Sequence, residues 1–498
     1  MMNDLLLGID VGTSACKVAV FDSNGKVIAA DNESYPLYYP NPGWVEQDPD
    51  EWWQAICKTI RRITGNPEIA DRIVGIGIDG QSWSAIPIDR EGNCLHNTPI
   101  WMDTRARDIS ARVRADIGED RIFEVAGNGF EPAYTTPKML WFKEEMPDVY
   151  RKTYQFLQSN SYIAFKLTGV ISQDLSQGYG IHFFDQKRLC YDEDLAKELG
   201  LDIDMLPEPV ACHKLIGTVS KEAAALTGLK CGVPVAAGGL DAACGTLGAG
   251  VVRPGQTQEQ GGQAGGMSIC MDEALAHPKL ILSTHVIPGL WLLQGGSVGG
   301  GGVLRWFKQE LAQGDESFDD LTKLAESVTP GSEGVLFLPY MAGERSPIWN
   351  PDAKAVFYGL SFNKTRAHMI RAALESVAFS LEHNLRTAGE VNAEVTEMIS
   401  VGGAANSRLW TQIKSDVTGK KIIVPSSDTA TTLGAAILAG VGTGIYKDFE
   451  EAVSKTVVFT REYFPDAEVH ENYKKVMDAY LSLYEHLKDF YHTYREVF

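Results

Sequence analysis

The sequence lacks the cysteine patterns that hold metal ions or disulfide frameworks. Its eight cysteines stand at positions 16, 57, 94, 190, 212, 231, 244 and 270, and no two of them form a Cys-x-x-Cys pair. This spacing predicts neither a structural zinc site nor a stapled secreted fold. A His-Glu-x-x-His zinc motif is absent as well. We therefore expect a reduced, cytosolic location and no zinc chemistry.

Long apolar runs and basic clusters are also missing. No apolar run approaches the roughly 20 residues needed to cross a bilayer, and the opening MMNDLLLGID holds too short an apolar stretch for a signal peptide. The 45 Lys and Arg residues are outnumbered by 65 Asp and Glu, which gives a formal charge of −20. Because nucleic acids and anionic membranes attract basic surfaces, we expect neither as a partner.

Common nucleotide and hydrolase motifs are absent or out of context. The sequence has no Gly-x-x-x-x-Gly-Lys-Ser/Thr loop, which excludes the P-loop kinases. Gly75–Gly80 fits G-x-G-x-x-G but lies in and just after an expected strand, and we interpret the match as accidental. Gly295–Gly299 fits G-x-S-x-G without the Asp-then-His order of α/β-hydrolases, so it is a weak signal.

The stretch that is most informative is Leu5–Asp22. Its apolar start predicts a buried strand with Asp10 at the end, followed by a tight turn at Gly12-Thr13-Ser14 and a returning strand at Val18–Phe21. Backbone N–H groups of such a turn can face a phosphate, and a carboxylate suits Mg²⁺. An ordinary hairpin with an Asp turn explains the same residues.

A second strand tip repeats this pattern. Val233–Gly238 predicts another buried strand, and it ends in Gly239-Leu240-Asp241 among small residues. A carboxylate in this setting can take a proton from a hydroxyl, although Asp241 could also cap the helix that follows. Two such tips suggest a duplicated domain, with both carboxylates facing one interdomain cleft.

The order of elements indicates the fold class. Three strands are followed by a helix that Asp48 caps and Pro49 opens, and then by a strand at Ile73–Ile78. This order is typical of the actin and ribonuclease-H-like ATPase fold. We expect an α/β protein with two such domains, residues 1–245 and 246–498. The second half predicts strands at 256–260, 267–270, 335–339, 398–401 and 422–424, and helices at 365–386, 430–439 and 470–498.

Seven stretches carry motifs: GIDVGTSACKVAVFD at 8–22, WVEQDPDEWW at 44–53, IWMDTR at 100–105, TPKMLW at 136–141, GGLDAACGTLGAG at 238–250, LPYMAGERSPIWNPDAKAVFYGLS at 338–361 and VGGAANSRLWTQIKSDVTG at 401–419. In this order and spacing they resemble the FGGY family of carbohydrate kinases, most closely its xylulokinase-like members. The resemblance covers essentially the whole chain.

The resemblance implies ATP-dependent phosphorylation of a sugar or polyol hydroxyl in the cleft between the two domains. Asp241 would be the general base, and Asp10 would help to hold Mg²⁺. The residues at the phosphates and the nucleotide would be Thr13, Ser14, Lys17, Gly261, Gly262, Gln263, Gly402, Gly403 and Asn406. The sugar contacts would be Gln81, Ser82, Trp83, Trp101, Asp103, Asp241 and Ala242.

The same resemblance orders the possible substrates. A pentulose such as D-xylulose comes first, and another ketose, a polyol or a sugar acid, as in glycerol- or gluconate-type kinases, is the alternative. A homodimer is a family-level expectation.

Three departures from the family pattern keep rival functions open. Ser82-Trp83 stands where xylulokinases commonly have Met-His, Ala242 stands where Asn is common, and Gln263-Ala264 replaces Thr-Ser of the phosphate loop. The last change motivates a catalytically silent sugar-binding regulator as one rival. An actin-like filament ATPase is another, which is disfavoured because Gln81–Trp83 and Trp101–Arg105 resemble a small-molecule pocket.

Overall fold

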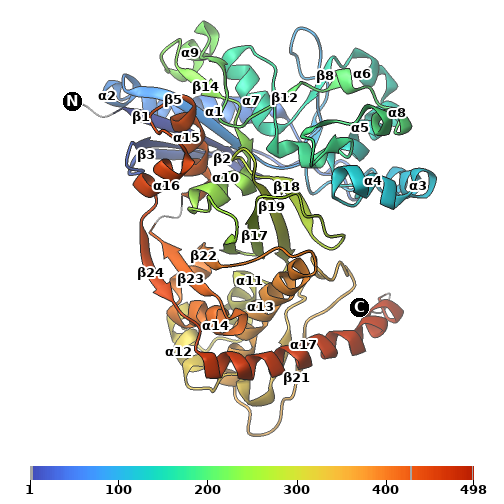
Figure 1. Ribbon diagram of the computed structural model, residues 1–498, viewed down its shortest axis with the longest axis vertical. Helices are drawn as coiled ribbons and strands as arrows, with labels where there is room; N and C mark the ends of the chain where they lie inside the picture. The colour runs from blue at the N-terminus through green and yellow to red at the C-terminus, as the bar shows by residue number, and fades with distance from the viewer. Residues whose placement is uncertain (1–3, 427–428, 496, 498) are drawn as a thin grey trace.

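Two seven-stranded sheets organise the part of the chain that the computed structural model describes, residues 4–426, 429–495 and 497 (Figure 1). The first has the order β13-β14-β5-β1-β2-β3, with β15 paired to β5. Its strands are β1 (Leu5–Val11), β2 (Ala15–Asp22), β3 (Val27–Ser34), β5 (Ile73–Gly80), β13 (Leu215–Thr218), β14 (Pro234–Ala236) and β15 (Gly239–Leu240).

The second sheet has the order β18-β19-β17-β16-β22-β23-β24. Its strands are β16 (Gln256–Gly261), β17 (Gly265–Met271), β18 (Ile281–Thr284), β19 (Trp291–Ser297), β22 (Glu397–Val401), β23 (Lys421–Pro425) and β24 (Phe459–Tyr463). The two sheets share a pairing pattern. In the first, β1 pairs antiparallel with β2, β2 antiparallel with β3, and β1 parallel with β5; in the second, β16 pairs antiparallel with β17, β17 antiparallel with β19, and β16 parallel with β22. This repetition is the duplicated α/β arrangement that the sequence predicts.

Local chemistry explains the first elements. All of β1 is buried, and β2 returns antiparallel to it, with Asp10 opposite Lys17. The Asp48 side chain accepts a hydrogen bond from the Asp50 amide and so caps α1 (Pro49–Thr64), which Pro49 opens as expected. The α1 side chains on its apolar stripe are buried against the sheet.

A helical region is inserted in sequence between β5 and β13 of the first sheet, and in Figure 1 it forms the green and cyan lobe beside that sheet. The helices of the first half are α2 (Pro67–Ala70), α3 (Arg107–Ile117), α4 (Glu119–Ala126), α5 (Thr135–Glu145), α6 (Pro147–Lys152), α7 (Ser159–Thr168), α8 (Glu193–Glu198), α9 (Lys221–Thr227) and α10 (Asp241–Gly248). The stretch Ala85–Ile88 followed by the turn Asp89–Gly92 predicts a local hairpin, and this prediction is wrong in one respect. β6 (Ile86–Ile88) pairs with the distant β8 (Gln155–Leu157), and only a single bridge, Ile88 to Cys94, closes the local turn.

The helices of the second half are α11 (Gly301–Glu310), α12 (Phe318–Glu326), α13 (Arg366–Gly389), α14 (Arg408–Thr418), α15 (Ala430–Gly442), α16 (Phe449–Thr456) and α17 (Ala467–Thr493). On one side of α17, Tyr473, Met477 and Tyr480 are buried against the core of this half. Positions 496 and 498 of the predicted tail helix lie outside the described residues.

Short elements complete the chain. The paired strands are β4 (Glu46–Gln47) with β7 (Thr98–Pro99), β9 (Gln173–Asp174) with β12 (Pro209–Val210), β10 (Phe184–Asp185) with β11 (Cys190–Tyr191), and β20 (Leu336–Leu338) with β21 (Val356–Tyr358). The 3₁₀ turns are η1 (Ser176–Gly180), η2 (Ile203–Met205), η3 (Ser332–Gly334) and η4 (Gly403–Asn406). Each of the eight cysteines, all among the described residues, is free. No helix in the described ranges is long and apolar enough to span a membrane.

α15 belongs to the second half of the sequence but packs on the first sheet, where it lies beside the blue strands in Figure 1. The approach is close enough to require glycine. A Cβ on Gly8 of β1 would lie 2.0 Å from the Thr432 carbonyl oxygen, and one on Gly77 of β5 would lie 1.8 Å from that of Ala435. The two sheets divide between β15 and β16, so the predicted 245/246 boundary falls within α10. α15 nevertheless ties the second half to the first sheet.

Candidate active site

Three carboxylates converge where the strands of the first sheet end. Asp10 on β1 and Asp79 on β5 are in-register neighbours of a parallel pair, so both side chains leave the same face of the sheet. Asp241 follows β15, which pairs with the end of β5, and is the first residue of α10. It does not cap the helix, because Leu240 is the N-cap residue; its Oδ1 accepts a hydrogen bond only from the adjacent Ala242 amide, at 2.6 Å.

The carboxylates perturb one another strongly. Burial raises the pKa of Asp10, and Lys17, whose Nζ lies 3.7 Å from Asp10 Oδ2, partly offsets this. Burial and then the Asp10 charge raise the pKa of Asp241 to about 7. Asp79 is fully enclosed, and burial, Asp10 and Asp241 together raise its pKa well above the ordinary value. Carboxylates that are buried together and repel one another electrostatically are typical of functional sites.

Asp79 is a site residue that sequence reasoning missed. The sequence placed it only at a strand end, although its alignment with Asp10 across two parallel strands was the available signal. Neither of its oxygens accepts a hydrogen bond from a donor among the described residues. A buried carboxylate without donors requires a bound proton or a cation. The Asp10 and Asp79 oxygens therefore fit a hard divalent cation in their chemistry.

A cavity of about 410 Å³ opens at this end of the sheet and unites many of the predicted residues. It is bordered by Asp241 and Ala242 of α10, by Lys17 of β2 and by glycines of the second half. The predicted site residues that line it are Lys17, Asp241, Ala242, Gly262, Gly402 and Gly403. Asp241 thus faces the glycine loops expected to hold phosphates, across the division between the two sheets.

The glycine loops meet without side chains between them. Gly402 has φ +87°, and a Cβ there would lie 2.9 Å from the Gly261 carbonyl oxygen. The Gly301 and Gly302 amides at the start of α11 donate to the carbonyls of Gly262 and Gln263 at 2.7 and 2.9 Å. The turn between β16 and β17 is therefore held by α11. Of the other predicted nucleotide residues, Asn406 ends η4 and does not line the cavity.

A second cavity, of about 530 Å³, lies beside Trp83 and Tyr134. The two rings stack with centroids 4.1 Å apart and planes 24° apart, and Trp83 holds an uncommon left-handed backbone with φ +60°. Arg345 and Trp349 from the second half of the chain form another part of its wall. Tyr134 was not predicted. Its position two residues before the TPKMLW motif was the available sequence signal.

The remaining predicted sugar residues connect these two regions. Gln81 donates to Gln47 Oε1 at 2.8 Å, and Ser82 Oγ accepts from the Tyr179 hydroxyl at 2.6 Å. Trp101 is 38% exposed, and its Nε1 donates to Thr13 Oγ1 at 2.9 Å. Trp101 therefore links the expected sugar wall to the Gly12-Thr13-Ser14 turn.

Asp103 lies elsewhere, and its predicted direct contact with sugar requires correction. The side chain is fully buried, and its oxygens accept from the Val45 amide at 2.6 Å and from Arg105. Arg105 also pairs with Glu46 at 2.8 Å and stacks on Trp44. With its lone pairs occupied and no exposed surface, Asp103 fixes the loop after Trp101 instead of meeting a ligand.

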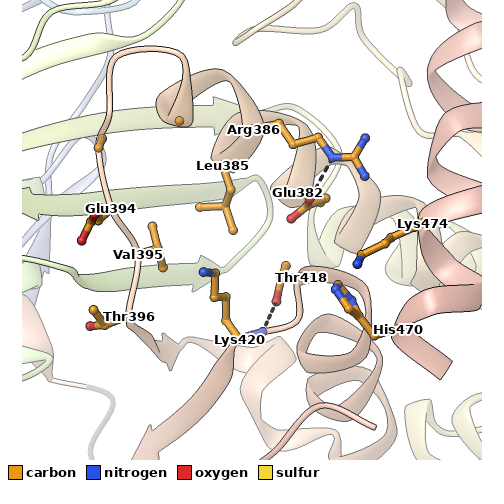
Figure 2. A pocket seen from close by; sticks show the side chains of 12 residues that line it. Glu382, Leu385, Arg386, Glu394, Val395, Thr396, Thr418, Lys420, His470 and Lys474 are labelled. Atoms are coloured by element: carbon orange, nitrogen blue, oxygen red, sulfur yellow. Dashed lines mark hydrogen bonds and ion pairs between the residues drawn. The ribbon is translucent and has the colours of Figure 1, made fainter. Parts of the chain in front are cut away.

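Another hollow, of about 680 Å³, lies between α13, α17 and the turn after α14 (Figure 2). Its cations are largely paired, since Arg386 bonds Glu382 and Asp478, and Lys474 bonds Glu471. None of the predicted site residues lines it. The carboxylate cleft is therefore the candidate active site. Within the described residues, no three His, Cys, Asp or Glu side chains form a metal-binding group.

Duplicated α/β sheets with a carboxylate cleft between them fit the expected actin-like ATPase class, and the comparisons identify the family. The FGGY family of carbohydrate kinases matches through its N-terminal domain at residues 5–248 and its C-terminal domain at residues 268–443. The chain belongs to this family. The predicted fold and family are therefore confirmed, and membership implies a sugar and ATP as substrates.

Relatives of two substrate types are similarly close. The chain is 31% identical to the xylulose kinase of Bacillus subtilis (strain 168) over 97% of both chains. It is 30% identical to the gluconokinase of the same organism, covering 98% of this chain and 97% of that one. The crystal structure of xylulose kinase from Rhodospirillum rubrum superposes with a TM-score of 0.92 at 28% identity, covering 98% of this chain and all of that chain. Sequence similarity alone leaves the sugar open.

Proposed function

We propose that this protein transfers the γ-phosphoryl group of ATP to a hydroxyl of a small ketose, with a pentulose such as D-xylulose as the first substrate to test. The observation that carries the proposal is the placement of Asp241 in the 410 Å³ cavity, opposite the glycine loops of the second half. The xylulose kinases among its relatives support the choice of sugar.

The residues of this chain divide the chemistry between them. Asp241 accepts the proton of the attacking hydroxyl, and its pKa of about 7 lets it do so near neutral pH. Lys17 and the main-chain amides around Gly262 and Gly402 hold phosphate oxygens. A catalytic cleft of this type works mainly by positioning and charge neutralisation. Asp10, with Asp79 beside it, would hold Mg²⁺, which neutralises charge on the phosphates when bound.

A sugar acid such as D-gluconate is the second candidate. The Arg345 guanidinium lines the 530 Å³ cavity and makes no ion pair with a carboxylate among the described residues. A carboxylate on the substrate would complement it. The gluconokinase relative is consistent with this alternative.

A coupled ADP-release assay over ketoses, polyols and sugar acids tests the proposal. We expect Mg²⁺-dependent ADP release with D-xylulose in clear excess over glycerol. Higher kcat/KM with D-gluconate would favour the sugar-acid candidate. No release with any member of the panel would contradict the proposal and favour a catalytically silent sugar-binding regulator. A cytosolic location and a homodimer remain predictions, and light scattering tests the latter.

A further inference from the structure

Lys138 is a fully buried lysine on α5 whose ammonium group bonds only main-chain carbonyls. Its Nζ donates to the Trp83 carbonyl at 2.8 Å and to the Ile100 carbonyl at 2.7 Å. It makes no ion pair with a carboxylate in the described part of the chain, and burial lowers its pKa to about 7. Burying an amine costs folding free energy, and an apolar side chain would fill the same space without that cost. The hydrogen bonds of Lys138 therefore indicate a role beyond packing.

The two carbonyls belong to the two loops that carry the expected sugar contacts. Trp83 contributes its own carbonyl, and Ile100 directly precedes Trp101. The loops are distant in sequence, and Lys138 connects them through one atom. Trp83 also has a left-handed backbone that a bulky residue rarely adopts, so its conformation must be held by its surroundings.

Neighbouring residues on the first turn of α5 reinforce this connection. The Tyr134 ring, immediately before the helix, stacks on Trp83. Thr135 Oγ1 donates to the Ser84 carbonyl at 3.2 Å. Tyr134, Thr135 and Lys138 therefore each contact the 82–85 loop, and Lys138 also reaches the Trp101 loop.

We propose that Lys138 is a positioning residue for sugar binding, holding the Trp83 and Trp101 loops at the spacing that the substrate requires. This inference rests on the proposed sugar-kinase function. Because Lys138 touches neither the 410 Å³ nor the 530 Å³ cavity, its effect passes through the loops. Its removal should weaken sugar binding while leaving the nucleotide side of the cleft intact.

The experiment compares Lys138→Met with a matched control, Lys143→Met, which replaces an exposed lysine on the same helix. The KM for D-xylulose, or for D-gluconate if the wild-type chain prefers it, is measured at saturating ATP, and the KM for ATP at saturating sugar. For Lys138→Met we expect a sugar KM raised about tenfold or more, as for loss of two charge-assisted hydrogen bonds. The ATP KM should change less than about twofold, and Lys143→Met should match the wild type.

A second measurement separates positioning from general stability. Hydrogen exchange in Lys138→Met should accelerate in peptides covering 81–86 and 98–104 but not in those covering β1 and β5. If Lys138→Met does not fold, Thr135→Val replaces it, and we expect a sugar KM raised about threefold with faster exchange at 81–86.

The outcomes are distinct. An unchanged sugar KM in the folded variant, or equal rises in both KM values with a lower melting temperature, would overturn the positioning role. A wild-type chain without turnover would defeat the proposed function instead. Exchange would then decide the Lys138 inference alone, and unchanged exchange at 81–86 and 98–104 would refute it.

Discussion

Trp83→Ala is the substitution that best separates a sugar wall from ordinary core packing. Trp83 is half-buried, lines the 530 Å³ cavity and stacks on Tyr134. Its indole N–H is enclosed and donates to no acceptor among the described residues, and under the pocket assignment a hydroxyl of the bound sugar supplies the missing acceptor. The hydrogen bond is worth about 0.5–1.5 kcal/mol, and packing on the C–H face of the sugar adds to it.

The resulting loss is about 1.4 kcal/mol or more, which raises the KM for sugar roughly tenfold. Steady-state kinetics should show this rise with an unchanged KM for ATP and a melting temperature close to that of the wild type. Trp83→Phe keeps a ring but removes the N–H, so its KM for sugar should lie between those of the wild type and Trp83→Ala. Trp291→Ala, which removes a half-buried tryptophan outside both cavities, serves as the control.

The opposite pattern would refute the assignment. If Trp83 were only a core residue, its truncation would cost about 3–5 kcal/mol of stability. Both substrates would then be affected alike. A destabilised variant with the wild-type KM for sugar would exclude Trp83 from the sugar site.

Three further predictions address the carboxylates and the cleft. Asp10→Ala should abolish Mg²⁺-dependent turnover without loss of the thermal transition; loss of that transition would make Asp10 structural. Because the pKa of Asp79 is raised, the folded chain keeps a proton that the unfolded chain releases above about pH 4. The stability that protonated Asp79 contributes to the folded chain is fully present below about pH 4, and it is lost as pH rises through the folded-state pKa of Asp79. Asp79→Asn should therefore flatten the fall in melting temperature between pH 5 and 8, measured in EDTA, and an unchanged slope would contradict the shift. Small-angle scattering should show a smaller radius of gyration with sugar and a non-hydrolysable ATP analogue. An unchanged profile at saturation would argue against closure.

Local signals in the sequence were sufficient for much of the fold. The apolar run of β1, the small-residue turn at Gly12-Thr13-Ser14 and the Asp48-Pro49 helix start each depend on neighbouring residues, and the structure contains all three. Asp10 and Asp241 could be identified as strand-end carboxylates for the same reason. The sequence motifs then supplied the family.

Long-range packing accounts for what could not be predicted. Asp103 appeared to be a cleft residue, but Val45 and Arg105 occupy its oxygens, and the Val45 contact spans 58 positions. α15 covers strands that include β1, and the contact of its Thr431 hydroxyl with Asp10 spans 421 positions, which no local period reveals. Asp79 joins the site only through its register with Asp10. In each case the decisive contact lies between segments distant in sequence.

The central claim is that Asp241 takes a hydroxyl proton during phosphoryl transfer to a sugar. Transfer of labelled γ-phosphate from ATP to D-xylulose should therefore be compared between the wild type and Asp241→Asn from pH 5.5 to 9. Asp241 must be ionised to accept the proton, so the wild-type kcat/KM should rise as pH passes through about 7. Asp241→Asn should bind both substrates, lose roughly 10²–10⁴ in kcat and lack this pH limb. Near-normal kcat in Asp241→Asn would contradict the claim.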